Sequence, residues 1–282
     1  MSAYRFCRTD DVGLLVDALN RCWSPSFPAD PVATPATFKR SIRDLQIWCS
    51  SCMVAFAGPD PIGVLIGGKR STGTLIHRIA VHPDHQRQGH GHHLLRSLGS
   101  KLAILGPPRM IAEVPESLTA ARELFNTSAY VEEARLTDYV MGPEGHDVRA
   151  GAFVIPVTVD DLAANGILGT TEKVCWERSV ETLTARKDEI AGIGIASEEQ
   201  IEAYVLYLDD GGDGAEIMAL RSFVEDADAR LAQLLARVRA LGKTRLGFGK
   251  VHPAELSRER LQSLGFRATG EHLLYAATAR SD

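Results

Sequence analysis

The chain is poor in cysteine and has no long apolar run, and each shortage excludes a class of protein. Its 282 residues include five cysteines, and such an odd, sparse set does not suggest the disulfide framework of a small secreted domain. No apolar stretch reaches the ~18–20 residues that cross a bilayer. Residues Met1 to Asp10 also lack the apolar core of a signal peptide. We therefore expect a cytoplasmic protein with no membrane partner.

Basic residues are not in excess either. Lysine and arginine number 31 against 36 aspartates and glutamates, which gives a formal net charge of −5. A general nucleic-acid binder would carry a basic excess that neutralises phosphates, so we expect no nucleic-acid partner. Hydrophobic residues make up 45% of the chain, which is enough for a buried core. The length suits one large domain or two of ordinary size.

One pair of cysteines has the spacing of a possible metal or redox motif. Cys49 and Cys52 form a CxxC pair, but a zinc site would need two more ligands and the sequence has no second pair. A thioredoxin-like pair should begin a helix after a strand, whereas this pair precedes the apolar run Met53 to Ala57. We interpret both residues as ordinary small apolar side chains and expect no metal.

Hydrophobic period and turn residues divide the first half of the chain into strands and helices. The predicted order is β-α-α-β-β-β-α-β-α-β. The predicted elements are a strand at 4–8, helices to about 22 and at 35–45, strands at 52–57, 62–69 and 74–81, a helix at 89–105, a strand at 109–114, a helix at 119–128 and a strand at 131–141.

The second half repeats part of this order after a linker at Gly142 to His146. The predicted elements are strands at 189–196, 201–208 and 215–223, a helix at 226–241, a strand at 244–252, a helix at 255–264 and a strand at 271–277, with a further helix within 166–186. We therefore predict an α/β protein with a mixed (α+β) sheet in two tandem domains, residues 1–142 and 150–282.

A glycine-containing loop follows the strand that ends at Val81. Its sequence is Gln86-Arg-Gln-Gly89-His-Gly91, and it opens a helix. The glycines let the backbone approach a ligand closely, and the first N–H groups of the helix point into the loop with the positive end of the helix dipole. Arg87 adds a full positive charge. Together these features predict an anion site that suits a diphosphate.

Two other glycine-rich loops are excluded, because neither GxGxxG nor GxxxxGK[ST] occurs here. The spacing instead resembles the [QR]-x-x-G-x-[GA] signature of the GNAT superfamily, the acetyl-CoA-dependent N-acetyltransferases, with Gln86, Gly89 and Gly91 at the fixed positions. The resemblance covers Tyr4 to Met141 well and the second half in outline. In layout the chain is similar to mycothiol synthase, a tandem protein of this superfamily.

The resemblance implies how acetyl-CoA lies as acyl donor. The pantetheine arm would pair with the strand ending at Val81, the diphosphate would bind the loop, and the thioester would reach the gap beside the strand Arg109 to Val114. The implied cofactor-binding residues are Ile79, Ala80, Val81, Gln86, Arg87, Gln88, Gly89, His90, Gly91 and His92.

Acyl transfer to an amine requires a neutral amine and a leaving thiolate. Removing the proton from an ammonium group at pH 7 costs roughly 4–5 kcal/mol, whereas leaving a thiolate unprotonated costs about 2 kcal/mol. The base should therefore matter more than the acid. His77 is our first candidate for the base, because it shares a strand face with Ile79 and Val81 if residues alternate. Glu113 on the next strand is the second candidate.

The sequence departs from the superfamily at its later helix. That helix often carries an asparagine and a tyrosine that protonates the thiolate, and these positions hold Leu118 and Phe125. Phenylalanine cannot donate a proton, but the thiolate can leave without one. Tyr130 or Tyr139 could substitute, and we choose neither. The departures motivate an alternative function, a CoA-binding regulatory or sensor protein without turnover.

Six histidines lie between His77 and His93, which raises the alternative of a metal site. His77 and His82 fall on opposite faces of the strand, and His90, His92 and His93 spread around the first helical turn, so we do not expect them to converge on one ion. In the second half the matching loop, Val224 to Asp228, has no glycine and three carboxylates, which would repel a diphosphate.

We therefore expect the first half to transfer an acyl group from acetyl-CoA to an amine. The second half would be a degenerate copy that shapes the acceptor pocket. The acceptor could be a small molecule or a peptide, and the chain is compatible with a homodimer. The sequence identifies neither the acceptor nor the assembly.

Overall fold

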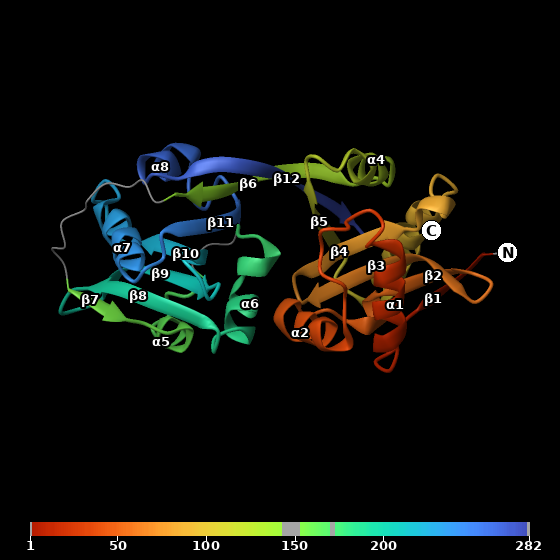
Figure 1. Ribbon diagram of the computed structural model, residues 1–282, viewed down its shortest axis with the longest axis horizontal. Helices are drawn as coiled ribbons and strands as arrows, with labels where there is room; N and C mark the ends of the chain where they lie inside the picture. Colours follow the sequence, from red (N-terminus) through yellow and green to blue (C-terminus); the bar gives the residue numbers. More distant parts are fainter. Residues whose placement is uncertain (1, 143–152, 170–172, 281–282) are drawn as a thin grey trace. The chain divides into compact units, whose positions relative to one another are not determined.

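The computed structural model describes residues 2–142, 153–169 and 173–280, and the chain forms two compact units (Figure 1). Unit 1 is made from the chain up to Ala134 and from Leu273 onward. Unit 2 is Arg135–His272. Of the linker predicted at Gly142 to His146, all but Gly142 lies outside the described residues.

Two long strands cross between the units along the chain. β6 (Val131–Met141) begins in unit 1 and ends in unit 2, whereas β12 (Arg267–Thr278) begins in unit 2 and ends in unit 1. The compact units therefore differ from the predicted domains 1–142 and 150–282, because the last strand returns to unit 1. The order of elements along the sequence does not reveal this return, because β6 and β12 each run without a break from one unit into the other.

Unit 1 has the predicted order of elements. They are β1 (Ser2–Phe6), α1 (Val12–Cys22), α2 (Pro35–Leu45), η1 (Cys49–Ser51), β2 (Met53–Ala57), β3 (Asp60–Arg70), β4 (Gly73–Val81), η2 (Pro83–His85), α3 (His90–Leu105), β5 (Arg109–Pro115), α4 (Thr119–Thr127) and the start of β6. Strand order in the sheet is β1-β2-β3-β4-β5, followed by the end of β12. The pair β4–β5 is parallel, whereas β1 to β4 are antiparallel neighbours.

Helices cover both faces of the unit 1 sheet. α1 and α2 bury Leu15 and Phe38 against Val64 on one face, and Figure 1 shows α1 in front of β3. α3 and α4 pack on the other face, where Leu94 and Phe125 belong to one apolar core with the opposite side chains of the strands. Because helices cover both faces of the sheet, the central strands carry apolar side chains on both faces.

Unit 2 repeats this plan. Its elements are the rest of β6, β7 (Val154–Pro156), α5 (Val159–Ala164), η3 (Trp176–Arg178), α6 (Val180–Ala185), β8 (Ile190–Ala196), β9 (Ile201–Asp209), β10 (Gly214–Ser222), α7 (Ala229–Ala240), β11 (Arg245–Val251), α8 (Arg258–Ser263) and the start of β12. Strand order is β6-β11-β10-β9-β8-β7, with β10 and β11 parallel. Of the helix predicted within 166–186, the described residues contain only η3 and α6. The predicted mixed sheet is confirmed.

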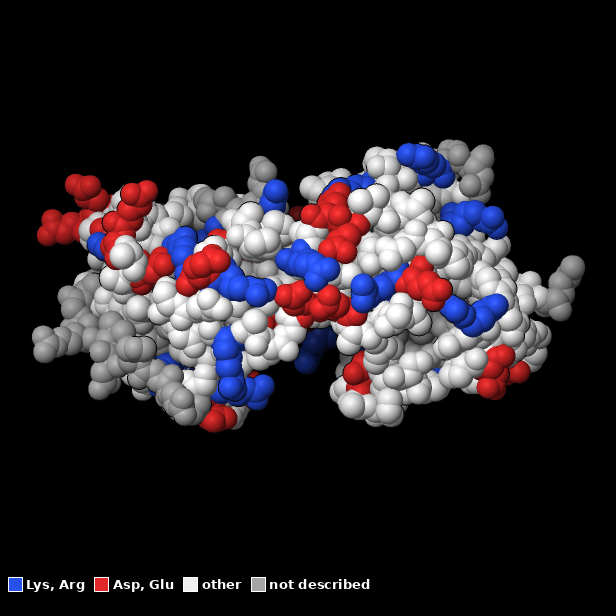
Figure 2. Space-filling view, turned by 90° about the horizontal axis from the view of Figure 1, so that it is seen from above, with Lys and Arg blue, Asp and Glu red and all other residues white. Residues whose placement is uncertain are grey.

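Charged side chains of both signs are interspersed over the face of the molecule in Figure 2. This mixture agrees with the small formal net charge of −5. Among the described residues, no helix is both long enough and apolar enough to cross a membrane.

Candidate active site

Two neighbouring strands of unit 1 diverge beside a cavity. β4 and β5 pair in parallel at Thr74–Met110 and Leu75–Ile111, and both strands continue for several residues beyond these pairs. Side chains from the two continuing stretches line one cavity of about 620 Å³. An extended ligand can pair with backbone groups at such an opening, in the way that an added strand pairs with a sheet edge.

β4 carries a bulge at His77, the predicted catalytic base. The ladder with β3 shifts register between Ile66 and Gly67, and His77 is the extra residue. Ile76 and Ile79 pack into the same core although they are three residues apart, so alternation is broken between them. Our assignment of a strand face to His77, which counted in twos along β4, therefore does not hold across the bulge. His77 nevertheless lines the cavity.

The loop between β4 and α3 is braced by its own side chains. After β4 comes η2, where His82 Nδ1 accepts a hydrogen bond from the Asp84 N–H at 3.3 Å. The side-chain amide of Gln86 donates to the Val81 carbonyl at 3.0 Å. Gln86, predicted as a cofactor-binding residue, thus ties the loop to the end of the strand and fixes the path of the backbone that follows.

The curvature of the loop comes from two residues with left-handed backbone. Arg87 has φ +60° and Gly89 has φ +86°. A Cβ added at Gly89 would meet no atom within 4 Å, so the backbone is open to a ligand here. Gly89 is the N-cap of α3, and no side chain caps that helix. Since the start of a helix leaves N–H groups with partial positive charge, the loop has the features of the predicted anion site.

The second glycine of the motif lets α4 approach the start of α3. A Cβ at Gly91 would lie 3.2 Å from the δ-methyl carbons of Leu124 on α4. Nearby, Arg87 Nη1 donates to Glu123 Oε2 at 2.8 Å, and both side chains are largely exposed. The guanidinium that we expected at the diphosphate is therefore shared with a carboxylate of α4. Exposed pairs of this kind contribute only about 0.2–1 kcal/mol, so a doubly charged phosphate can compete with Glu123.

The clustered histidines have separate partners. The Tyr4 hydroxyl and His90 Nδ1 are 2.6 Å apart, and the His93 ring lies 3.7 Å from the Tyr4 ring. Burial lowers the pKa of His93, which reduces its positive charge near neutral pH. His92 Nε2 and Thr127 Oγ1 are 2.9 Å apart. Because the His90 side chain is buried against Tyr4, the backbone N–H of His90 is the group it can offer to an anion.

Neither histidine nor cysteine builds a metal centre in the part of the chain that the structure describes. No group of three or more histidine, cysteine, aspartate or glutamate side chains there could hold an ion. All five cysteines are free and buried. Burial raises the pKa of the Cys52 thiol, which keeps it protonated and unreactive. This agrees with the interpretation of Cys49 and Cys52 as small apolar side chains.

The structure brings almost all of the predicted site residues to one place. The cavity of about 620 Å³ is lined by His77, Glu113, Ile79, Ala80, Val81, Gln86, Arg87, Gly89, His90, Gly91 and His92. Gln88 instead lines a neighbouring hollow, and its side-chain amide donates to the Asp84 carbonyl at 3.4 Å. Their roles in binding and catalysis remain predictions.

One wall of the cavity was missed by the sequence reasoning. Trp23, Ser26 and Phe27, from the segment after α1, line it together with Arg78 of β4. The proline-rich segment has no periodicity that would place its aromatic residues. The sequence did contain one indication of this wall, the basic residue Arg78 that directly follows the candidate base on β4.

Phe125 and the tyrosines near it do not supply an acid to the cavity. Phe125 is buried, and its ring stacks on Tyr275 with 5.6 Å between centroids. The Tyr130 hydroxyl donates to Met110 Sδ at 3.6 Å, and burial raises the pKa of Tyr130. Tyr130 lines the neighbouring hollow, and Tyr139 belongs to unit 2. No tyrosine is among the described residues that line the cavity.

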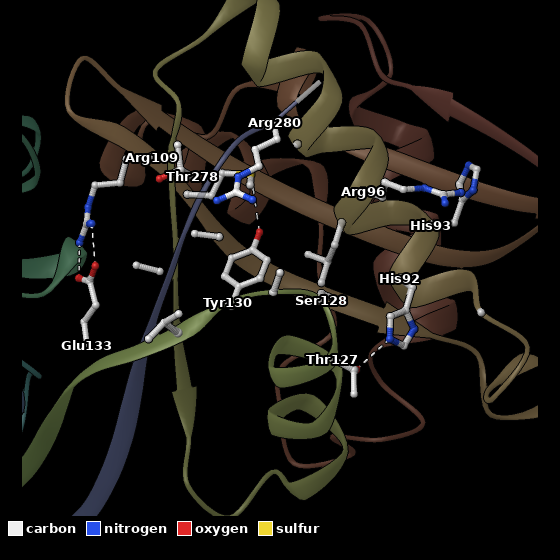
Figure 3. A pocket seen from close by; sticks show the side chains of 18 of the residues that line it. His92, His93, Arg96, Arg109, Thr127, Ser128, Tyr130, Glu133, Thr278 and Arg280 are labelled. Atoms are coloured by element: carbon white, nitrogen blue, oxygen red, sulfur yellow. Dashed lines mark hydrogen bonds and ion pairs between the residues drawn. The ribbon is translucent and has the colours of Figure 1, made fainter. Parts of the chain in front are cut away.

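The neighbouring hollow of unit 1 has a volume of about 910 Å³ and a basic lining (Figure 3). Arg96, Arg109 and Arg280 line it, whereas Glu133 is its one acidic residue among those described. Glu133 accepts two hydrogen bonds from the Arg109 guanidinium, at 2.9 and 2.5 Å. Gly89, His92 and Thr127 line both this hollow and the cavity. The hollow therefore begins at the anion loop.

Unit 2 has the counterpart of the β4 bulge but not its chemistry. The ladder between β9 and β10 shifts register so that Met218 is the extra residue. Met218 is the fifth residue of β10, as His77 is the fifth residue of β4. Met218 is buried in an apolar core and cannot act as a base. At the start of α7, Asp226 and Asp228 bind Arg230 and Arg260, so the predicted acidic loop is present.

A buried arginine lies against β11, one of the two parallel strands of unit 2. Arg178 donates to the carbonyls of Gly249 and Lys250 on β11 and makes two hydrogen bonds to Glu255, at 2.6 and 2.7 Å. Its charge also acts on Glu216 of β10, whose pKa is raised by burial and lowered in part by Arg178. A charged side chain thus lies where unit 1 has its open gap.

Comparisons with known proteins agree with this geometry. The model of the acetyltransferase (GNAT) family matches residues 14–129. No match was found among curated protein sequences. Among solved structures, a tandem GNAT protein from the clavulanic acid biosynthesis pathway is 16% identical with a TM-score of 0.65, covering 100% of this chain and 99% of that one. A GCN5-related N-acetyltransferase from Sphaerobacter thermophilus is 12% identical with a TM-score of 0.68, covering 99% and 96%.

The structural matches are below 25% identity and show the fold, whereas the family model matches the half that contains the anion loop and the cavity. Both predictions, a GNAT-type acetyltransferase and a tandem arrangement, are confirmed at this level. Residues 14–129 therefore match the acetyltransferase (GNAT) family, in a chain that has the fold of tandem GNAT proteins.

Proposed function

We propose that unit 1 transfers an acetyl group from acetyl-CoA to an amine. One observation carries the proposal: the loop that ends in the uncapped start of α3 lies at the mouth of the cavity between the diverging strands β4 and β5. A diphosphate at the loop and a thioester in the cavity are then parts of one extended ligand. The open space at Gly89 fits this ligand, since nothing lies where a Cβ would be.

In this arrangement the backbone of the chain supplies most of the binding. The N–H groups at the start of α3 would hold the diphosphate, and Arg87 would exchange Glu123 for a phosphate oxygen. Ile79, Ala80 and Val81 would pair with the amides of the pantetheine arm along β4. Acetyl-CoA supplies an acyl group activated as a thioester.

The chemistry requires one base and one oxyanion donor. His77, or Glu113 from β5, would take a proton from the ammonium group of the acceptor. The neutral nitrogen then forms a bond to the carbonyl carbon, a backbone N–H of β4 stabilises the oxyanion, and the C–S bond breaks. The thiolate can leave without a proton donor and take its proton from water, which fits the position of Phe125 in the core.

The basic hollow beside the loop suits the outer part of the same ligand. CoA carries a third phosphate on its ribose, beyond the diphosphate. Arg96 and Arg280 line the hollow that begins at Gly89 and His92. We propose that this hollow receives the ribose phosphate, which explains why basic side chains continue past the loop.

A second candidate function is a CoA-binding protein without turnover. The observation that favours it is Phe125, which is buried among Tyr130 and Tyr275 and offers no hydroxyl. The acceptor class, the cytoplasmic location, the absence of nucleic-acid and membrane partners, and a homodimer all stay predictions.

Two measurements separate the candidates. Calorimetry with CoA tests binding, and release of free thiol from acetyl-CoA in the presence of an amine library tests transfer. The acyltransferase predicts both binding and amine-dependent thiol release. Binding without thiol release from any amine would favour the sensor, and absence of CoA binding would contradict both.

A further inference from the structure

The end of the cavity near the bulge of β4 is walled by an aromatic and basic group of residues. Trp23 and Phe27 stack with 4.2 Å between ring centroids, and the Arg78 guanidinium lies 4.8 Å from the Trp23 ring centroid. All three residues line the cavity together with His77 and Glu113. The wall adjoins the candidate base along β4, because Arg78 directly follows His77.

Local hydrogen bonds hold the wall in place. The N–H groups of Ser26 and Phe27 both donate to the Trp23 carbonyl, at 3.0 and 3.1 Å. Trp23 Nε1 donates to Asp30 Oδ2 at 2.8 Å. A wall that is fixed before binding loses little conformational entropy when a ligand packs on it.

The Arg78 guanidinium is oriented mainly by its contact with the Trp23 ring, because its ion pair is long. Its ion pair with Asp30 Oδ2 spans 4.0 Å, and that same oxygen already accepts the indole N–H of Trp23 at 2.8 Å. Within the described residues, the side chain of Arg78 makes this ion pair and the contact with the Trp23 ring. A guanidinium oriented by an aromatic ring keeps its planar donors for a carboxylate.

The charges around the bulge form a complementary pair. Arg78 is positive, and it directly follows His77, whereas Glu113 on β5 supplies a carboxylate to the same cavity. An acceptor with an ammonium group and a carboxylate a few bonds apart would place the ammonium toward His77 and Glu113 and the carboxylate on Arg78. Trp23 and Phe27 would cover an apolar or aromatic side chain.

We propose that the acceptor is an amino acid with a free α-carboxylate and an apolar or aromatic side chain, anchored by Arg78. This inference rests on the proposed acetyl transfer and names its substrate class. An acceptor without a carboxylate would leave the guanidinium buried beside the ligand with poor hydrogen bonds, which is unfavourable.

The test compares three probes that differ at one group: phenylalanine, phenylalaninamide and phenethylamine, each with acetyl-CoA and a thiol-release assay. We expect kcat/KM for phenylalanine to exceed that for the two analogues without a carboxylate by at least about tenfold. In Arg78→Gln this preference should disappear through a higher KM for phenylalanine. Arg78→Lys, which keeps the charge and loses the planar fork, should fall between.

The matched control is Arg21→Gln, which removes an exposed arginine of α1 that pairs with Asp60 and should leave the preference unchanged. CoA affinity, measured by calorimetry, should be the same in all variants. If CoA binds but the amide or the amine is preferred, if Arg78→Gln keeps the preference, or if none of the three probes releases thiol, the acceptor class is wrong. If CoA does not bind, the proposed function itself fails.

Discussion

His77 lies at the bulge of β4, one residue before the guanidinium that faces Trp23. A bulge aims a side chain away from the regular alternation of a strand, and here the extra residue is an imidazole that lines the cavity. The equivalent extra residue in unit 2 is Met218, which is buried among apolar side chains. The same backbone irregularity thus carries a titratable group in one unit and a core side chain in the other.

Replacing His77 by alanine should lower kcat by about a hundredfold, because proton removal from an ammonium group is the most costly protonation step. The acidic limb of the pH–rate profile should also disappear. CoA affinity should not change, since the proposed diphosphate site is the loop after Val81 and not His77. His252→Ala, which removes a histidine of unit 2, is the control. Equal rates for wild type and His77→Ala at pH 7 would exclude His77 as the base.

Glu123 restrains the positive charge that the loop needs. It accepts a hydrogen bond from Arg87 at 2.8 Å, and this exposed ion pair must open when a phosphate binds Arg87. We expect Glu123→Gln to tighten CoA binding by up to about fivefold, the equivalent of ~1 kcal/mol for an exposed pair. The measurement is calorimetry at low salt. Asp60→Asn removes a comparable exposed partner, that of Arg21, and should change nothing. Weaker binding in Glu123→Gln would show that Glu123 supports the site.

At the scale of elements, the start of α3 organises the whole anion site. Its N-cap is Gly89, and no side chain satisfies its first N–H groups. By contrast, α2 has a capping box made by Thr34 and Thr37, and α7 begins among carboxylates that bind arginines. A glycine N-cap in place of Ser, Thr, Asn or Asp costs a helix only about a few tenths of a kcal/mol, and it leaves donors for a ligand.

A substitution in the basic hollow next to α3 tests whether the ribose phosphate of CoA binds there. Arg96→Gln should weaken binding of CoA by about fivefold, since a charged hydrogen bond contributes of the order of 1 kcal/mol at an exposed site. The same variant should bind dephospho-CoA as the wild type does. Arg40→Gln on α2, which packs on the opposite face of the sheet, is the control. An equal loss for both ligands would exclude the hollow as the site of the ribose phosphate.

The elements that form the anion site were predictable because they are local. Gln86, Gly89 and Gly91 follow an apolar strand and open an amphipathic helix, and each feature can be recognised within twenty residues of chain. The bulge at His77 was not predictable, because it depends on the register with β3. The aromatic wall was also missed, since Trp23 and Phe27 lie in a segment without a repeating pattern.

At the scale of the whole molecule, two units with the same plan have diverged in opposite directions. Unit 1 has a cavity beside its parallel strands, and unit 2 places the buried Arg178 against β11. The Arg178 and Glu255 side chains are 3% and 1% exposed. Burial opposes the charge on Arg178, yet Cys175 and Glu255 raise its pKa overall. The sequence showed the missing glycines of this unit but not the arginine, whose partners lie more than seventy residues away.

Removing one partner of this buried pair should destabilise the protein. We expect Glu255→Gln to lower the free energy of unfolding by about 3–5 kcal/mol, because the guanidinium would stay buried without its counter-charge. Glu271→Gln, which removes a partly exposed partner of Arg135 and Arg258, should cost less than about 1 kcal/mol. Denaturant unfolding measures both. At denaturant concentrations below its unfolding transition, Glu255→Gln should bind CoA as the wild type does. A decrease in the free energy of unfolding of less than about 1 kcal/mol would contradict a structural role for the pair.

The return of the last strand to unit 1 also escaped sequence reasoning. β12 supplies Leu273 and Tyr275 to the core that contains Phe125, so the end of the chain completes the domain that the family model matches only to residue 129. Hydrophobic alternation predicted the strand. Its position next to β5 depends on tertiary pairing that a pattern of single residues does not encode.

The most direct test of the account is calorimetric titration of CoA into wild type and Gly89→Glu. The substitution places bulk and negative charge at a left-handed, open position at the start of α3. The control is Gly58→Glu, which alters another open glycine with positive φ, in the turn between β2 and β3. We predict that Gly89→Glu loses CoA binding by at least about a hundredfold, while Gly58→Glu binds as wild type does. Equal affinities for the two variants would contradict the placement of the diphosphate, and with it the proposed function.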